Sequence, residues 1–290
     1  MAGDGVRDRV GSYFDPALAR SWLLFSGGDY SQFAVAVRSP ADIVVLDIDD
    51  MVSPPDKDAA RDNAARWIDE RSADHLAGAK IWVRVNGCGS PWWAADLDAL
   101  SRTQVSGVVL STVESVDHVT ATAERLLGVA ILALVETTRG LENISEIASA
   151  RSTFRLAFGV GDFCLDTGFE NDPAALAHAR SRFTVASSAA RLPSAIDGPT
   201  VGPVSALELV RAVRTSSRFR MTAKFYLSPD QCSTINQVLS PSIDEIEWAR
   251  GGGVARQDNP MARTDSEPPQ VTQATTILDR AQSYRLTDAK

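Results

Sequence analysis

Two acidic side chains follow two apolar segments that are close together in the chain, and their positions suggest a metal site. Glu136 comes directly after the apolar run 130–135, and Asp162 comes directly after the run 154–161. The segment between the runs, 140–151, has apolar residues at helical spacing, which predicts a strand, a helix and a second, parallel strand. Both carboxylates then lie at the same edge of a sheet. Two close carboxylates repel each other unless a proton or a cation lies between them, and Mg²⁺ prefers such oxygen ligands.

A second interpretation of Glu136 and Asp162 requires no metal. Acidic side chains are stabilised near the first turn of a helix, because the helix dipole places partial positive charge there. Both residues precede or begin a predicted helical segment. They could therefore serve only as caps of the helices that follow them, and this alternative remains open at the level of the sequence.

An arginine inside an apolar segment is a third residue that indicates chemistry. Arg84 lies within the run 80–87, and a lone guanidinium is expensive to bury there without an anion. A substrate carboxylate could be that anion, because Arg binds carboxylates through two parallel hydrogen bonds. An aspartate at the end of another strand, such as Asp47, Asp49 or Asp50 after the run 43–46, is the alternative partner.

The segments that position these residues alternate between buried strands and helices. This alternation predicts an α/β fold, specifically a (β/α)8 TIM barrel with a C-terminal helical and lid extension. An open doubly wound sheet of the flavodoxin type is the competing fold, because the seventh predicted strand is short. The predicted strands are 20–26, 43–50, 80–87, 107–111, 130–135, 154–161, 193–198 and 221–228. The predicted helices between them are 33–37, 56–70, 92–100, 116–127, 140–151, 173–192 and 205–216, with a loop at 163–171.

The two ends of the chain differ from the middle in composition. Residues 1–18 are polar and glycine-containing and are expected to be a loosely ordered lead-in, so the barrel is assigned to 19–240. The remainder, 241–290, is predicted to form C-terminal helices at 243–250 and 271–284. Gly251, Gly252 and Gly253 break the first of these helices, and the polar segment 257–269 that follows has the composition of a lid or, equally, of a dispensable tail.

Composition excludes several classes of function. The chain of 290 residues has a net charge of −8 and no basic stripe, which argues against nucleic acid and anionic membranes as partners. Its longest apolar run, 126–135, is too short to span a membrane, and the first residues lack a signal-peptide pattern, so a cytoplasmic location is expected. The three cysteines are widely spaced, which suggests neither disulfides nor zinc. Lys57, Arg61 and Arg66 would ordinarily form the solvated face of a helix.

Several short motifs occur in the order found in one known family. They are Arg20-Ser21 before a strand and Gly27, Leu46-Asp47-Ile48-Asp49-Asp50, Arg84-Val85-Asn86, Glu136-Thr137-Thr138-Arg139-Gly140, Gly161-Asp162-Phe163 and Ile196-Asp197-Gly198. In this order they resemble the HpcH/HpaI aldolase and citrate lyase superfamily. The most similar branch contains the citrate lyase beta subunit and the malyl-CoA and citramalyl-CoA lyases.

The resemblance implies a fold, a reaction and a set of residues. The fold is a TIM barrel, and members cleave or form a carbon–carbon bond beside a carbonyl, commonly with a CoA thioester as one partner. The implied Mg²⁺ ligands are Glu136 and Asp162, and the implied substrate-binding residues are Arg20, Arg84, Gly161 and Asp162. The implied catalytic residues are Arg84, Asp49 and Asp265, the last on the lid. A homo-oligomer, a trimer or hexamer, is also implied.

Two positions depart from the family pattern. Leu110-Ser111-Thr112 stands where the family has Leu-Pro-Lys, and Leu227-Ser228-Pro229 stands where it has Ile-His-Pro. Both changes remove cationic contacts to an anionic substrate, and Ser228 cannot replace a histidine as a base near pH 7. Two hypotheses follow. The first is a Mg²⁺-dependent lyase acting on a hydroxy acyl-CoA or a related hydroxy acid. The second is a degenerate barrel that binds an acyl-CoA or keto acid as a sensor or assembly subunit.

Overall fold

The computed structural model describes the chain apart from residues 1–14, 74–80, 201, 203, 253–268 and 287–290. Contacts divide the chain into two compact units, one ending at Ile235 and the other beginning at Asn236. The expected boundary after residue 240 falls just past helix α10 (Cys232–Leu239).

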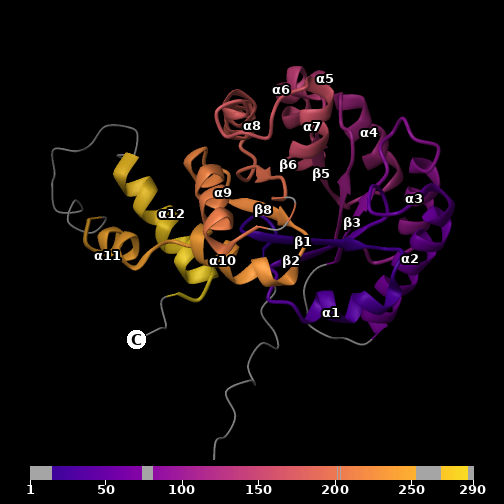
Figure 1. The fold of residues 1–290 in the computed structure, drawn as a ribbon, viewed down its shortest axis with the longest axis horizontal. Helices are drawn as coiled ribbons and strands as arrows, with labels where there is room; N and C mark the ends of the chain where they lie inside the picture. The colour runs from indigo at the N-terminus through magenta and orange to yellow at the C-terminus, as the bar shows by residue number, and fades with distance from the viewer. Residues whose placement is uncertain (1–14, 74–80, 201, 203, 253–268, 287–290) are drawn as a thin grey trace, which may run out of the picture. The chain divides into compact units, whose positions relative to one another are not determined.

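Eight parallel strands of the described chain close into a barrel (Figure 1). Each strand pairs with its neighbours in sequence, and β8 pairs with β1, which an open sheet could not do. The predicted (β/α)8 TIM barrel is therefore confirmed, and the flavodoxin-like alternative is wrong. The strands are β1 (Ser21–Ser26), β2 (Ile43–Asp47), β3 (Ile81–Val85), β4 (Gly107–Leu110), β5 (Ala130–Val135), β6 (Thr153–Phe158), β7 (Ile196–Asp197) and β8 (Ala223–Tyr226).

Helices surround the strands and connect them (Figure 1). They are α1 (Phe33–Arg38), α2 (Lys57–Ala73), α3 (Trp93–Leu100), α4 (Val116–Arg125), α5 (Thr138–Glu142), α6 (Ile144–Ser149), α7 (Val160–Thr167), α8 (Ala177–Ala189) and α9 (Ala206–Arg218). Two predictions are wrong here. The segment 140–151 forms two short helices that meet at Asn143, and the loop expected at 163–171 begins inside α7.

The barrel interior is filled by side chains that alternate along each strand. Residues two apart on one strand share the interior, as Trp22 and Leu24 do on β1 and Leu132 and Leu134 do on β5. Gly107 makes room for the ring of Trp82, because a Cβ at Gly107 would lie 2.5 Å from that ring. The result is a packed core.

A buried arginine closes the end of the barrel where the strands begin. Arg155 of β6 is fully buried and donates hydrogen bonds to the carbonyl oxygens of Ser194 at 2.6 Å, Pro16 at 3.1 Å and Ala19 at 3.2 Å. The guanidinium also lies over the ring of Trp22. Backbone oxygens thus stabilise this charge, and the carboxyl ends of the strands are the end that remains for a site.

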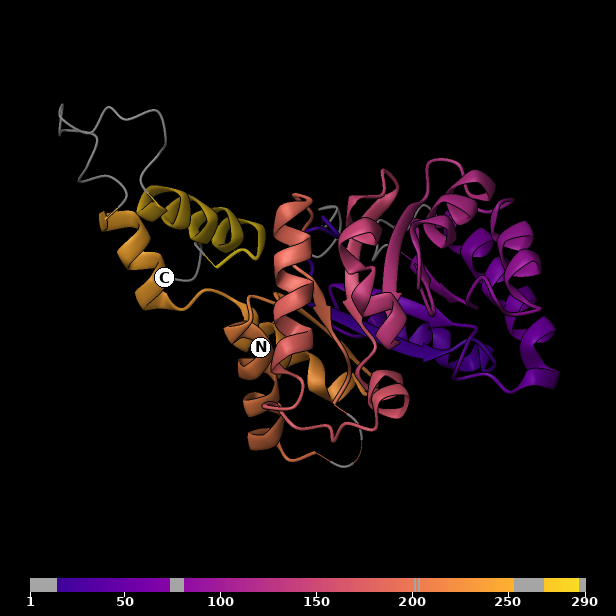
Figure 2. The same cartoon turned by 90° about the horizontal axis from the view of Figure 1, so that it is seen from above.

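The second unit contains a pair of helices. Helices α11 (Ile243–Gly252) and α12 (Pro269–Ser283) lie next to each other (Figure 2). Ile246 and Ala249 of α11 pack with Ala274, Ile277 and Ala281 of α12. Gly251 and Gly252 still belong to α11, so the helix does not end at the first glycine as predicted. Within the described residues, no helix is long and apolar enough to cross a membrane.

Candidate active site

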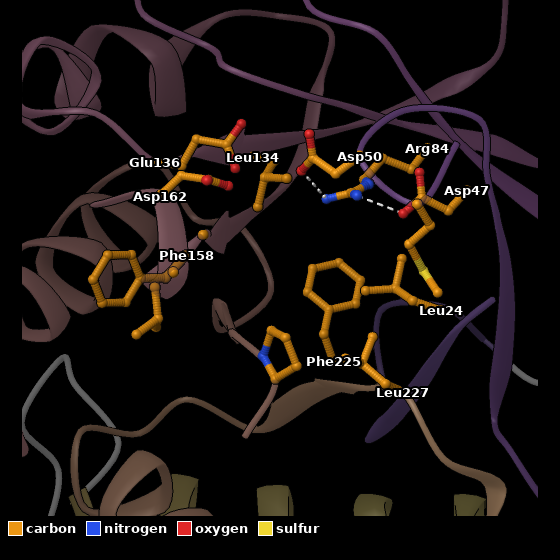
Figure 3. Close-up of a pocket in the computed structure, with 15 residues that line it drawn as sticks. Leu24, Asp47, Asp50, Arg84, Leu134, Glu136, Phe158, Asp162, Phe225 and Leu227 are labelled. Atoms are coloured by element: carbon orange, nitrogen blue, oxygen red, sulfur yellow. Dashed lines mark hydrogen bonds and ion pairs between the residues drawn. The ribbon is translucent and has the colours of Figure 1, made fainter. Parts of the chain in front are cut away.

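A cavity of about 190 Å³ opens at the carboxyl ends of the barrel strands (Figure 3). Its lining includes residues of β1, β2, β3, β5, β6 and β8. The ionisable residues that line it are Asp47, Asp50, Arg84, Glu136 and Asp162. Four of the predicted site residues, Arg84, Glu136, Gly161 and Asp162, therefore meet at one cavity, although they are far apart in the chain.

Glu136 is held so that one of its two oxygens is free. Oε1 accepts hydrogen bonds from the backbone N–H of Thr112 at 2.7 Å and from the Thr112 hydroxyl at 2.9 Å. Oε2 is buried and has no hydrogen-bond partner in the described part of the chain. A Cβ at Gly159 would lie 2.4 Å from Oε2, so only glycine leaves room for the carboxylate. The capping alternative is wrong for Glu136, because Thr137 is the N-cap of α5.

Asp162 reaches the cavity from a helix and not from a strand end. Strand β6 stops at Phe158, Gly159 is the N-cap of α7, and Asp162 lies in the first turn of that helix. The predicted strand 154–161 was therefore too long. Asp162 nevertheless lines the same cavity as Glu136, on the same side of it (Figure 3).

The two carboxylates fit a magnesium site. Burial raises the pKa of Glu136 to about 8, Arg84 opposes this shift, and the negative charge of Asp162 adds to it. A cation would replace the proton and satisfy Oε2. Mg²⁺ commonly takes one or two carboxylates and fills its other positions with water and substrate. The described residues contain no group of three or more His, Cys, Asp or Glu side chains that could hold a metal ion by themselves.

Glu136 should make the metal-free protein less stable as the pH rises. Its folded pKa of about 8 exceeds its ordinary value of 4.5, so it contributes stability below 4.5 that is lost as the pH rises through about 8. Between these values we expect the parent to lose up to about 1.4 kcal/mol per pH unit relative to Glu136→Gln. Urea unfolding of both proteins in chelator at several pH values measures this. If the free energy of unfolding of the parent and of Glu136→Gln changed with pH in parallel, the raised pKa of Glu136 would be contradicted.

Arg84 lines the cavity and is paired with two aspartates. One terminal nitrogen forms an ion pair with Asp47, and the other lies 3.0 Å from Oδ2 of Asp50. Asp47 is fully buried, whereas the side chain of Asp50 is 56% exposed. The sequence left a strand-end aspartate and a substrate as alternative partners of Arg84. The structure shows the aspartates, and of the two only Asp50 is exposed enough to be displaced by a substrate carboxylate.

Asp49, which was predicted to be catalytic, is not among the residues that line the cavity. Its carboxylate lies 3.4 Å from Nζ of Lys57, which also donates to the Asp49 carbonyl at 2.8 Å and to Oδ1 of Asn86 at 2.7 Å. Its neighbours Asp47 and Asp50 line the cavity instead. Lys57 and Arg61 are buried, so the predicted solvated face is wrong for both residues.

Of the two remaining predicted residues, only Arg20 belongs to the described part of the chain. Arg20 precedes β1 and thus lies at the end of the barrel opposite the cavity, where its Nε contacts Oδ2 of Asp42 at 2.8 Å. Asp265 lies outside the described residues. The sequence offered Asp50 only as a possible partner of Arg84 and Thr112 only as a departure from the family pattern, so it gave neither residue a place in the site. The acidic motif after β2 could have indicated Asp50, but no sequence signal joins Thr112 to Glu136.

Comparisons with known proteins agree with this geometry. Residues 20–216 match the family model HpcH/HpaI aldolase/citrate lyase. The chain is 30% identical to a citrate lyase subunit beta-like protein of Mycobacterium tuberculosis, covering 91% of this chain and 96% of the relative. It is 28% identical to the L-malyl-CoA/beta-methylmalyl-CoA lyase of Cereibacter sphaeroides, covering 81% and 83%.

A solved structure shows the same fold. It is that of protein CitE from Mycobacterium tuberculosis in complex with magnesium, acetoacetate and coenzyme A. The TM-score is 0.76 with 27% sequence identity, and the match covers 92% of this chain and 99% of the other. The resemblance inferred from the motifs is confirmed, and the chain belongs to the HpcH/HpaI aldolase/citrate lyase family.

Proposed function

We propose that this protein is a Mg²⁺-dependent lyase that cleaves or forms a carbon–carbon bond in a hydroxy acyl-CoA or a related hydroxy acid. The observation that carries the proposal is the free, buried Oε2 of Glu136 beside Asp162, in a cavity that Arg84 also lines. The names of the relatives support the reaction class, and the magnesium and coenzyme A of the solved relative support the cofactor and the substrate class.

The residues of the site have distinct roles in this proposal. Glu136 and Asp162 hold the metal, which supplies Lewis-acid stabilisation of negative charge on a substrate carbonyl oxygen. Thr112 fixes the orientation of the Glu136 carboxylate through its two hydrogen bonds. Arg84 attracts the substrate carboxylate, and the buried walls of the cavity exclude water from the reacting carbons.

The cleavage direction requires one proton to leave and one to be added. The substrate hydroxyl gives its proton to a base, the bond between the hydroxyl carbon and the neighbouring carbon breaks, and the electron pair moves toward the thioester carbonyl. The neighbouring carbon then takes up a proton. Asp265 as the base stays a prediction. Within the described chain, Asp50 is the exposed carboxylate at the cavity that is not assigned to the metal.

Product analysis tests the proposed function. The protein is incubated with a panel of 3-hydroxy acyl-CoA thioesters, with Mg²⁺ or with chelator, and the CoA products are separated by mass. We expect a shortened acyl-CoA and a carbonyl compound, formed only when Mg²⁺ is present. Release of free CoA alone would indicate thioester hydrolysis. Binding of the panel without any turnover would favour the sensor or assembly role. The homo-oligomer, a trimer or hexamer, stays a prediction.

A further inference from the structure

The cavity has two chemically different sides (Figure 3). Asp50, Arg84, Glu136 and Asp162 lie on one side. The other side carries an apolar wall on which Leu24, Phe158, Phe225 and Leu227 lie, and Leu134 lies between Glu136 and Asp50. The wall residues are buried apart from Leu227, whose residue exposure is 41% and which lies at the mouth. A ligand in this cavity therefore meets oxygen ligands on one side and hydrocarbon on the other.

The charged side has too few cations for a ligand with two carboxylates. Four carboxylates line the cavity in the described chain, whereas Arg84 is the one cation, and its two terminal nitrogens already face Asp47 and Asp50. A bound Mg²⁺ leaves the lining net negative. One ligand carboxylate can lie directly beside the metal and Arg84, where it has cations next to it. A second carboxylate would face the apolar wall and lose its hydration without a counter-ion.

We propose that the site selects a 2-oxo acid of the form R–CO–COO⁻ in which R is a hydrocarbon group, or the hydroxy acyl thioester that contains this skeleton. The inference rests on the proposed function, because the metal side sets the position of the carboxylate and keto oxygens. R then packs on the apolar wall, where its burial removes apolar surface from water. Leu227 at the mouth limits which R groups enter.

Two 2-oxo acids of similar shape test the proposal. In oxaloacetate the group R is CH2–COO⁻, and in 4-methyl-2-oxopentanoate it is CH2–CH(CH3)2, so the pair differs mainly in charge. With Mg²⁺ in excess, calorimetry on the full chain should show 4-methyl-2-oxopentanoate binding about tenfold more tightly or better, as expected for apolar groups of this size in a matching pocket. Equal affinities, tighter binding of oxaloacetate, or binding of neither acid would overturn the proposal.

A charge placed on the wall should remove most or all of the preference. Leu227→Lys puts a cation at the exposed mouth, so oxaloacetate should gain and 4-methyl-2-oxopentanoate should lose affinity, closing the difference by about tenfold. Leu207→Lys is the matched control, because Leu207 of α9 is also an exposed leucine but does not line the cavity. An unchanged preference in folded Leu227→Lys, or an equal change in the control, would overturn the assignment of the wall.

The same measurements without Mg²⁺ separate this inference from the proposed function. If the parent binds no Mg²⁺, the proposed metal site is wrong, and the two acids are compared with the metal-free protein. If the metal-free parent prefers the apolar acid and Leu227→Lys loses this preference, the result would still support the apolar wall as the binding surface for R. If Mg²⁺ binds normally but the preference is absent, the wall proposal is wrong and the metal site stands.

Discussion

Glu136→Gln should weaken Mg²⁺ binding by more than about 100-fold, because even the loss of groups that merely orient metal ligands typically costs about 10- to 100-fold. The substitution keeps the size of the side chain but removes the negative charge and turns one oxygen into an NH2 group. Asp162→Asn should have an effect in the same direction from the other side of the cavity. Calorimetry and the Mg²⁺-dependent shift in the unfolding temperature measure both effects.

The control for this experiment is a chemically identical change at the surface. The Glu142 side chain on α5 is 75% exposed and lies 3.8 Å from Arg182, so Glu142→Gln should leave Mg²⁺ affinity unchanged. The metal assignment would be wrong if Glu136→Gln and Asp162→Asn both stayed folded by circular dichroism and bound Mg²⁺ like the parent. Loss of binding in the Glu142 variant as well would indicate a nonspecific effect of charge.

Asp197→Ala should destabilise the barrel by about 3–5 kcal/mol, because it leaves buried positive charges without their carboxylate. Asp197 of β7 is buried, and its Oδ1 accepts from Nε of Arg180 at 3.2 Å. Its Oδ2 accepts from Ser216 and lies 3.4 Å from Nζ of Lys224. Burial alone would raise the pKa of Asp197, but Lys224 and Arg180 lower it. The charged carboxylate is therefore the form that the fold stabilises.

Urea unfolding measures this effect, with an exposed ion pair as the control. Asp98→Ala removes a carboxylate 3.0 Å from Arg125, but that aspartate side chain is 64% exposed, so its loss should cost no more than about 1 kcal/mol. A comparable loss in both variants would show that burial does not determine the cost. Lys224 also donates to the Gly198 carbonyl at 2.6 Å. If Asp197→Ala leaves Lys224 without its carboxylate, we expect the backbone from Gly198 to Pro199, which lines the cavity, to become less well held.

The sequence determined the barrel because each buried strand can be recognised from its own run of apolar residues. Continuous apolar runs such as those of β5 and β6 are buried on both faces in a parallel sheet, and regular alternation with helices leaves few topologies. Glu136 was identifiable for the same reason, since it ends an apolar run. Asp162 was identified because it follows the apolar run 154–161, but the sequence did not show that it belongs to the helix α7. The residues 159–161 after β6 are apolar or glycine, and they continue the apolar pattern past the true end of the strand.

Only the tertiary structure decided which charges meet. Lys57 and Arg61 look like solvated helix residues, but α2 turns them toward Asn86 and toward the buried Asp96, which are distant in sequence. In the sequence, Thr112 stands where the family has a lysine, which indicated only that a cation is missing. In the closed barrel, Thr112 donates the two hydrogen bonds that hold Glu136. Local patterns set which segments are buried. Barrel closure sets which side chains from different segments face one another, because it fixes the register and the order of the strands.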